Sequence, residues 1–418
     1  MARNKIITGL DIGTSNIKAL VVEKRGNEWN VLSYSQIPSF GLRRGSVVNV
    51  EETARNIQIL MSNIEKDCGR RINSAYVNIG GSHLYVTPSD GLISVSRADH
   101  IISQEDIERV LQATRAINIP MNEEILDVFP KEFIIDDQKG VKHPLGLSGV
   151  RLQARVLLLC YFQQNFINLT QAVLGAKIQI DDIIPSPLAA AEAVLTREQK
   201  ETGVALIDIG SSTTSLAVFE EGDLIHLAIF PLGSSNITND LAIGLKTEIA
   251  IAEDIKKQHG ACVVPEKNEK DTIVKTLSSN GAKKKKLEIS NQTHSPSFTK
   301  KDLVSIIEPR VSEILDLMQK ELKKIGRQEL LPGGIVLTGG GSKLPKIKEL
   351  AKDHLKLPCK VAAPKNIVGL EEDPALSTVV GLVMSSPDFY EESNINLPFG
   401  FMKNWNSKFK KMFRVFIP

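Results

Sequence analysis

The sequence predicts an α/β protein made of two related halves, and an internal repeat is the main observation behind this prediction. Residues 10–22 read LDIGTSNIKALVV and residues 207–219 read IDIGSSTTSLAVF. In each copy an apolar strand leads into Asp-Ile-Gly, two small hydroxyl residues follow, and apolar alternation returns, as in a β-hairpin. A third strand-like segment follows each copy, and helical patterns cover residues 51–66 and 237–258. Two α/β halves of about 200 residues each are the simplest interpretation.

The composition is that of a folded, soluble chain. Its 418 residues are 42% hydrophobic and 24% charged, which is enough for two or three cores. The net charge of +2 argues against a nucleic-acid partner, because nucleic-acid-binding domains are usually strongly basic. The four cysteines are far apart and form no metal-ligand motif, which favours a reducing compartment. Because no signal peptide or 18-residue apolar span is present, the sequence predicts a cytosolic protein that does not cross a membrane.

Each repeated turn is predicted to bind phosphate. A glycine lets the backbone turn tightly, so that successive N–H groups and hydroxyls can contact phosphate oxygens. Asp11 and Asp208 end their strands and are candidate Mg²⁺ ligands, acting through water because this ion dehydrates reluctantly. Lys18 could reach a terminal phosphate, whereas the second copy has Ser215 in its place. An ordinary tight hairpin is the alternative for one copy, but two copies favour phosphate binding. The predicted contacts are Gly13, Thr14, Ser15, Asn16 and Lys18 in the first half and Gly210, Ser211, Ser212, Thr213 and Gly233 in the second.

A third glycine-rich site lies at residues 333–345, GGIVLTGGGSKLP. An apolar strand runs into Thr338 and three glycines, and Leu344-Pro345 is predicted to open a helix with proline in its first turn. Stacked glycines remove side chains where a flat base or a sugar must approach the backbone. A plain strand-to-helix loop is the alternative, but the two phosphate turns favour a nucleoside site. The predicted contacts are Gly339, Gly340, Gly341, Ser342 and Lys343.

The two Asp-Ile-Gly turns and the late TGGGS loop resemble the actin/Hsp70/hexokinase superfamily, whose fold is a pair of RNase H-like (actin-like) domains around a nucleotide cleft. Small-residue helices at 184–195 and 373–382 fit the helices that cross between the two domains. Four stretches resemble the FtsA family of bacterial cell-division proteins more closely: GLSGVRL at 146–152, AEDIK at 252–256, IEPR at 307–310 and a basic, aromatic tail. The resemblance covers almost the whole chain. It implies that the chain binds ATP with Mg²⁺, and that Glu253 and Lys256 lie over the ribose and base.

The resemblance also implies a division of the chain into domains. Residues 1–81 and 163–198, with 370–384, form the first actin-like domain, and residues 82–162 form an inserted FtsA-type subdomain for self-association and for contacts with other division proteins. Residues 199–369 form the second domain, whose extension at about 240–310 contacts the filament protein FtsZ. Local patterns predict a helix after Ser103, which is a plausible N-cap, a buried strand at 151–162 and a helix over 300–325. Residues 278–297, with four consecutive lysines, are predicted to be a solvated loop.

Arg310 and Glu313 lie one helical turn apart in the predicted extension. By resemblance they are expected to contact the acidic C-terminal tail of FtsZ. The alternative is an exposed helical ion pair that contributes a few tenths of a kcal/mol.

The chain departs from the superfamily pattern in ways that bear on hydrolysis. Ser211 and Ser212 replace glycines that the second phosphate turn often has, and Ser186-Pro187 stands where relatives often have Glu-Pro. The missing carboxylate is a candidate for positioning the attacking water, and Glu192, which falls where actin places a water-positioning amide, is a weak catalytic substitute. Three loops therefore support nucleotide binding, and much less supports turnover. We expect a nucleotide-dependent assembly switch that is at most a slow ATPase, below about one turnover per second.

The chain ends in FMKNWNSKFKKMFRVFIP, residues 401–418. On a helix this segment has a basic face and an apolar face, the pattern of a helix that lies in the headgroup region of a membrane, where each cation near an anionic leaflet adds about 1 kcal/mol. Residues 385–400 are predicted to be a linker. A terminal helix docked on the protein's own core is the alternative. The apolar face consists of Phe401, Trp405, Phe409, Met412, Phe413 and Phe416, and the basic face of Lys403, Lys411 and Arg414.

The leading hypothesis is an ATP-binding, actin-like division protein that polymerises and tethers FtsZ filaments to anionic lipids. It would be a peripheral protein at the inner face of the cytoplasmic membrane, at the division site. A PilM-like scaffold of a pilus or secretion assembly is the alternative, because it shares the fold and the phosphate turns but is not expected to have the tail. A sugar or acetate kinase would need an acidic general base between the domains, and the sequence offers no convincing one.

Overall fold

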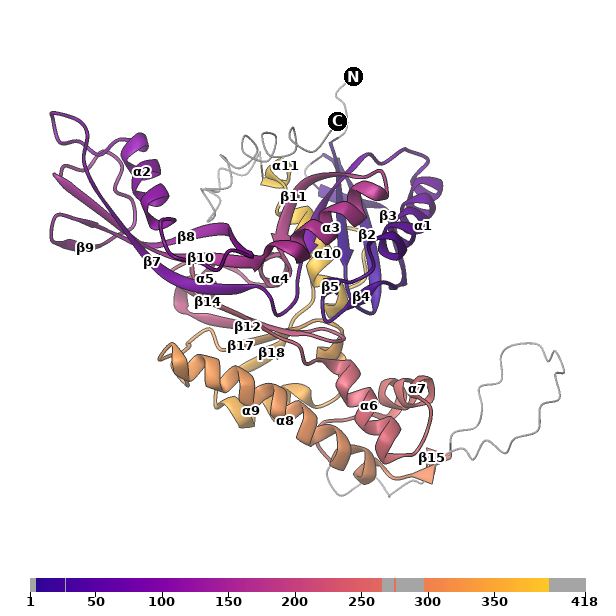
Figure 1. Ribbon diagram of the computed structural model, residues 1–418. Coiled ribbons are helices and arrows are strands. Elements are labelled where there is room, and N and C mark those ends of the chain that lie inside the picture. Colours follow the sequence, from indigo (N-terminus) through magenta and orange to yellow (C-terminus); the bar gives the residue numbers. More distant parts are fainter. Residues whose placement is uncertain (1–4, 27, 265–273, 276–296, 391–418) are drawn as a thin grey trace.

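The structure is a computed structural model that describes residues 5–26, 28–264, 274–275 and 297–390. These residues build two α/β domains, one above the other in Figure 1, and a β-rich subdomain that projects sideways from the upper one. The predicted tail helix, most of the predicted linker and nearly all of the predicted lysine-rich loop lie outside the described residues.

The first domain is a five-stranded sheet with helices on both faces. Ala19 and Val21 pack toward α1 (Val50–Cys68) and α3 (Gln163–Gly175), whereas Leu20 and Val22 pack toward α10 (Ser377–Met384). Because both faces of the sheet are covered, the middle of the central strand β2 is a continuous apolar run, ALVV at residues 19–22. In the order β11-β6-β1-β2-β3, the strands are β1 (Ile6–Ile12), β2 (Asn16–Arg25), β3 (Glu28–Pro38), β6 (Ser74–Ile79) and β11 (Gln179–Pro185).

The second domain repeats this topology. Its sheet order β14-β13-β12-β17-β18 corresponds strand for strand to β3-β2-β1-β6-β11. In the two central hairpins Asp11 lies opposite Lys18, and Asp208 lies opposite Ser215. The internal repeat predicted from the sequence is therefore confirmed. The strands are β12 (Val204–Ile209), β13 (Thr214–Glu220), β14 (Asp223–Phe230), β17 (Ile335–Thr338) and β18 (Cys359–Val361).

Four helices pack with the second sheet: α6 (Ser234–Gly244), α7 (Ile249–His259), α8 (Lys300–Lys324) and α9 (Ile347–Leu355). The prediction of a single helix over 237–258 was wrong, because the backbone turns after Gly244 and passes through Lys246 in a left-handed conformation (φ 52°). The prediction that Pro345 lies in the first turn of a helix was also wrong. A 3₁₀ turn, η1 (Gly340–Lys343), fills the glycine loop, and α9 begins two residues after the proline.

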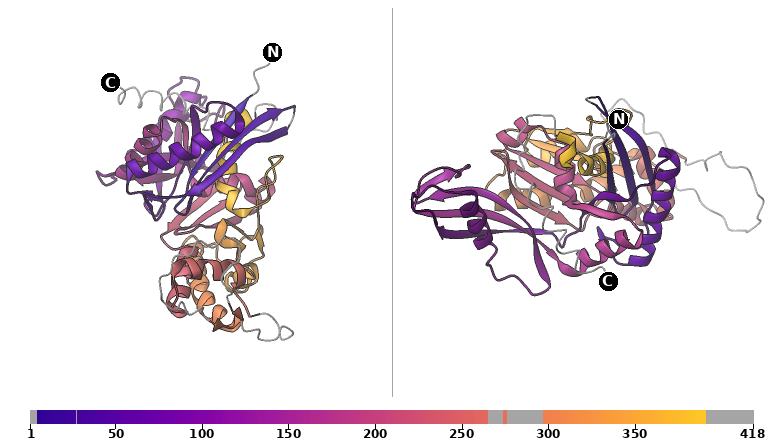
Figure 2. Two further views of the ribbon diagram at one scale, coloured as in Figure 1. Left: turned by 90° about the vertical axis from the view of Figure 1, so that its right-hand side faces the viewer. Right: turned by 90° about the horizontal axis from the view of Figure 1, so that it is seen from above.

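The inserted subdomain is an antiparallel sheet with one helix. Its strands β7 (Tyr85–Ser94), β8 (Glu123–Ile135), β9 (Gln138–Val141) and β10 (Arg151–Phe162) have the order β7-β10-β8-β9. The helix α2 (Gln104–Thr114) packs on β7 and β10. Ser103 caps this helix in a capping box with Asp106, which confirms the predicted N-cap. The view from above in Figure 2 shows the subdomain extending to one side of the two-domain body.

The helices α4 (Ser186–Val194) and α10 cross each other, and α4 lies between the two domains. The helix α4 contacts strands of both sheets and packs against α10. At the crossing, a Cβ atom on Gly381 would lie 1.7 Å from the Ala189 carbonyl oxygen, so the two backbones touch directly. This contact confirms the close packing expected of the connecting helices. After α4, α5 (Arg197–Thr202) leads into β12.

Short elements complete the described chain: β4 (Leu42–Arg43), β5 (Ser46–Val47), β15 (Val274–Lys275), β16 (Ser297–Phe298), η2 (Pro374–Leu376) and α11 (Pro387–Tyr390). The last of these docks on the first domain, where Phe389 stacks on Trp29 with ring centroids 5.2 Å apart and Asp388 pairs with Lys5 at 3.2 Å. Among the described residues, none of the helices combines the length and the apolar character that a membrane span requires.

Candidate nucleotide site

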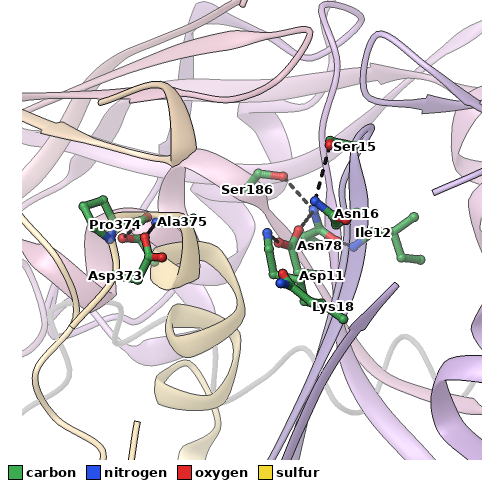
Figure 3. A network of polar contacts seen from close by, with 12 residues as sticks. Asp11, Ile12, Ser15, Asn16, Lys18, Asn78, Ser186, Asp373, Pro374 and Ala375 are labelled. Atoms are coloured by element: carbon green, nitrogen blue, oxygen red, sulfur yellow. Dashed lines mark hydrogen bonds and ion pairs between the residues drawn. The ribbon is translucent and has the colours of Figure 1, made fainter. Parts of the chain in front are cut away.

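The turn between β1 and β2 holds Asp11 between two polar side chains. The carboxylate accepts from the Lys18 ammonium at 2.9 Å and from the Asn78 amide at 3.0 Å. The Asn78 carbonyl oxygen in turn accepts from the backbone N–H of Ile12 at 2.6 Å. Figure 3 shows Asp11 within this network. Asn78 was not predicted as a site residue, although it is the one amide in the apolar strand AYVNI.

The tips of the two repeated turns contact each other. The Ser212 hydroxyl lies 2.9 Å from the Thr14 hydroxyl. In the first turn, a Cβ on Gly13 would lie 2.8 Å from the Asn16 carbonyl oxygen, so this position requires glycine. The neighbouring side chains of Ser15 and Asn16 are hydrogen bonded to each other at 3.3 Å.

The start of α6 closes the second turn. The backbone N–H groups of Ser234 and Ser235 donate to the carbonyl oxygens of Gly210 and Ser211 at 2.9 and 2.7 Å. Gly210 N–H donates to the Thr213 carbonyl at 2.9 Å. A Cβ on Gly233 would lie 2.5 Å from the Ser211 carbonyl oxygen. The structure thus brings together all the residues predicted for the two phosphate turns.

The third glycine loop packs against the end of β12. Gly339 has a φ of 82°, and a Cβ there would lie 2.1 Å from the Asp208 carboxylate. A Cβ on Gly341 would lie 2.4 Å from the Ile209 side chain. Gly340 begins η1, the buried Ser342 hydroxyl donates to the Gly339 carbonyl at 2.8 Å, and Lys343 pairs with Asp373 at 2.7 Å. The predicted nucleoside loop therefore adjoins the second phosphate turn.

The charged groups of the cleft influence one another strongly. Burial, together with the negative charge of Asp11, raises the pKa of Asp208 to about 6, against the opposing effect of Lys18. For Lys18, burial alone would lower the pKa, but the Asp11 carboxylate raises it above the usual value. Two carboxylates therefore face one ammonium in a partly dry site. A divalent cation would stabilise both carboxylates in their ionised form.

These carboxylates fit a hydrated Mg²⁺ ion. The described residues contain no group of three His, Cys, Asp or Glu side chains that could enclose a metal, so direct coordination by a complete protein shell is not available there. Mg²⁺ commonly keeps several waters and uses one or two carboxylates together with substrate phosphates. Asp11 and Asp208, which end the equivalent strands of the two halves, match that donor set.

The helix pair α6–α7 carries the predicted ribose and base contacts. The ammonium of Lys256 is buried and contacts the Glu253 carboxylate at 2.7 Å, the Thr238 hydroxyl at 2.8 Å and the Ser234 carbonyl at 3.1 Å. Because Ser234 also binds the second turn, α7 is tied to that turn through α6. Lys256 thus has a structural contact in addition to its predicted role.

Two other predicted residues have partners that the sequence did not reveal. Glu192 pairs with Lys200 at 2.8 Å, and both side chains are mostly buried, so positioning of a water by Glu192 would require this pair to open. Arg310 contacts Glu313 and also binds both carboxylate oxygens of Asp240 on α6, at 2.6 and 3.0 Å. The alternative of an exposed ion pair between Arg310 and Glu313 is therefore incomplete as a description, because Arg310 also joins α8 to α6.

A groove lies between the end of α6 and the start of α8. Ile306, the last residue of α8 that lines it, is about one helical turn before Arg310. The groove has a volume of 430 Å³ and its floor includes apolar side chains. The lining residues are Gly244, Leu245, Lys246, Phe298, Asp302, Ser305 and Ile306.

Duplicated α/β domains, with equivalent turns meeting between them, define this chain as an actin-like protein. Solved structures of the same class agree: the PilM–PilN type IV pilus biogenesis complex has a TM-score of 0.63 and 20% identity over 90% of this chain and 97% of the matched chain. MreB5 of Spiroplasma citri bound to ADP has a TM-score of 0.53 and 14% identity over 94% and 99%. At these identities the likeness concerns the fold alone.

Sequence comparison identifies the family. The model "Cell division protein FtsA" matches residues 205–381, and the model "SHS2 domain inserted in FTSA" matches residues 81–160. Cell division protein FtsA of Pseudomonas aeruginosa is 38% identical over 91% of this chain and 89% of its own length. The chain belongs to the FtsA family of cell division proteins, which confirms the predicted resemblance.

Proposed function

We propose that this protein binds ATP with Mg²⁺ between its two domains. The observation that carries the proposal is the contact between Thr14 and Ser212, which places two phosphate-type turns and the carboxylates of Asp11 and Asp208 around one point. The third glycine loop adjoins this point through Gly339. MreB5, which has the same fold, was solved with ADP bound. The turns would hold the phosphates, and the glycine loop would contact the nucleoside.

Hydrolysis is proposed to be slow. Ser186, which replaces the carboxylate that relatives often have, accepts from Asn78 at 3.0 Å and donates to the Ile79 carbonyl at 3.1 Å. A hydroxyl engaged in this way is a poor general base. Calorimetric titration with ATP·Mg²⁺ tests binding, with Asp208→Asn expected to weaken it at least tenfold. Turnover faster than about one per second would contradict the assignment as a switch.

The α6–α8 surface is the proposed site for the acidic FtsZ tail. Arg310 supplies a cation that Asp240 and Glu313 hold in place, and the adjoining groove supplies apolar contacts. An acidic, partly apolar peptide could use both features. Fluorescence anisotropy with an FtsZ C-terminal peptide should show at least a tenfold loss for Arg310→Glu and little change for Lys320→Glu, an exposed control on the same helix. Equal losses would point to a general charge effect.

Membrane attachment and polymerisation complete the proposal. The described chain ends on the first domain at α11, so the amphipathic segment follows from the domain opposite the proposed FtsZ site (Figure 1). Many weak tails acting together in a polymer would gain avidity. Flotation with anionic liposomes, with and without ATP and FtsZ, should show binding of the full chain and none after truncation at Gly400. Equal flotation of both proteins would refute an anchor in the tail.

The PilM-like scaffold remains as the second candidate because a PilM complex shares the fold. A scaffold of that kind should not bind the FtsZ peptide, so the anisotropy measurement separates the two functions. Sedimentation of the protein with ATP, in the presence and absence of liposomes, tests polymerisation independently of either partner.

A further inference from the structure

A polar cluster joins the two segments that connect the inserted subdomain to the first domain. His83 lies just before β7, where the chain enters the subdomain, and Asn165 lies in the first turn of α3, where the chain has left it. The Asn165 amide donates to His83 Nδ1 at 3.0 Å and to the Ser46 hydroxyl at 2.9 Å. The Ser46 hydroxyl is also 3.2 Å from His83 Nδ1. One contact set therefore holds both connections of the subdomain.

The same cluster reaches the first phosphate turn. Gly45, next to Ser46, donates its backbone N–H to the Thr14 hydroxyl at 3.0 Å. A Cβ on Gly45 would lie 2.8 Å from the Gly81 nitrogen, and a Cβ on Gly81 would lie 2.8 Å from His83 Nδ1. A small cavity of about 10 Å³ adjoins these residues, but the contacts of Gly45 with Gly81 and of Gly81 with His83 are themselves direct. A displacement of Thr14 would therefore be passed to His83 by direct contact.

His83 is held at an energetic cost. Because Nδ1 accepts from Asn165, the ring proton is on Nε2, and this buried atom has no hydrogen-bond partner within the described structure. A buried donor without a partner destabilises the folded state. That cost is understandable if the residue serves to fix the connection between subdomain and turn.

A second attachment joins the flank of the subdomain to the other domain. Lys142, which follows β9, contacts Asp223 at 2.6 Å and Glu221 at 3.1 Å. These carboxylates lie at the turn of the β13–β14 hairpin, whose first strand starts at the second phosphate turn. Strand β14 also packs on β7 and β8. The subdomain is thus attached to both sides of the nucleotide cleft.

We propose that these two attachments couple nucleotide binding to the position of the inserted subdomain. This inference rests on the proposed ATP site. A phosphate held by both turns must replace the direct hydroxyl contact of Thr14 with Ser212, which moves the two halves of the cleft apart locally. One attachment lies on each half, so the same movement strains the Lys142 ion pairs. Bound ATP would loosen them, and loosening them would favour ATP, because the coupling is reciprocal.

Lys142→Ala tests the flank attachment, with Lys139→Ala as control because it removes an exposed cation from the same hairpin. ATP affinity, measured by calorimetry, should rise about fivefold or more in Lys142→Ala, the lower end of typical couplings, and stay within twofold in the control. Hydrogen exchange of residues 215–230 should increase on adding ATP to the wild type and should not respond in Lys142→Ala. If both variants bind ATP like the wild type, the coupling is refuted. If the wild type itself binds no ATP, the proposed function fails as well.

Asn165→Ala tests the other attachment, with the exposed neighbour Gln164→Ala as control. Loss of the cluster should leave Thr14 less well held and weaken ATP binding about fivefold or more. ATP should change the hydrogen exchange of residues 85–94 in the wild type and should not change it in Asn165→Ala. Thermal unfolding identifies variants that do not fold, and Ser46→Ala, which removes a single hydroxyl, then tests the same link. Wild-type affinity and exchange in both Asn165→Ala and Ser46→Ala would overturn this half of the inference.

Discussion

Replacing Gly381 with alanine should disrupt the crossing of α4 and α10. The added Cβ would lie 1.7 Å from the Ala189 carbonyl oxygen and 2.3 Å from its carbonyl carbon. Ordinary contacts between such atoms need about 3.4 Å or more, so the helices must separate by more than an ångström. Both helices are buried here, and overpacking of a buried contact typically costs about 1–3 kcal/mol, occasionally more. Because the clash involves backbone atoms that cannot rotate away, we expect about 3 kcal/mol or more.

Thermal unfolding and ATP titration should measure this effect in parallel. The midpoint of unfolding should fall by several degrees, and ATP affinity should fall because the crossing helices set the relation between the two domains. Gly175→Ala is the matched control, since its added Cβ meets only the Ala54 side chain at an ordinary 3.5 Å. A Gly381→Ala protein as stable as this control would refute the packing argument.

Three further changes have distinct expected outcomes. Gly339→Ala should weaken ATP binding at least tenfold in a calorimetric titration, because the Cβ would lie 2.1 Å from the Asp208 carboxylate at a φ of 82°; unchanged affinity would place the nucleoside elsewhere. Burial raises the pKa of Asp127 to about 7 in the folded protein, from 3.8 as the ordinary value. The protonated side chain therefore contributes stability that is fully present below pH 3.8, and this stability is lost as the pH rises through about 7. Asp127→Asn should therefore raise the free energy of unfolding by about 1–3 kcal/mol at pH 8 and by less at pH 5, and denaturant titrations at both pH values check the sign. Asp240→Ala should cost about 1 kcal/mol of stability and reduce FtsZ-peptide affinity in the anisotropy measurement, because Arg310 would lose one of the two carboxylates that hold it.

The repeated motif made the topology predictable, because a hairpin with the same turn in each half fixes equivalent strands in both sheets. The glycine loop was likewise visible because three adjacent glycines are rare without a backbone reason. The break between α6 and α7 was not visible, because apolar residues keep their helical spacing across Gly244 and Lys246. Helical periodicity indicates which face of a helix is buried, but it does not indicate where one helix ends and the next begins in a new direction.

The partners of the site residues were hidden because they come from distant parts of the chain. Asn78 meets Asp11 only when β6 pairs with β1, and Asp240 meets Arg310 only when α6 packs on α8. A polar residue in an apolar strand, such as Asn78, is a usable signal. Asp240 offered no such signal in the sequence, because an acidic residue on an amphipathic helix is ordinary.

The docking of α11 determines how a pulling force would enter the molecule. Tension on the chain beyond this helix would act first on the Phe389–Trp29 stack and the Asp388–Lys5 ion pair, and then on α10, which lies against the central strands of the first sheet. From α10 the load would pass to α4 through the contact of Gly381 with Ala189, and so to the second domain. The crossing helices would then serve as the mechanical joint of the protein, and the direct backbone contact between them would make that joint stiff.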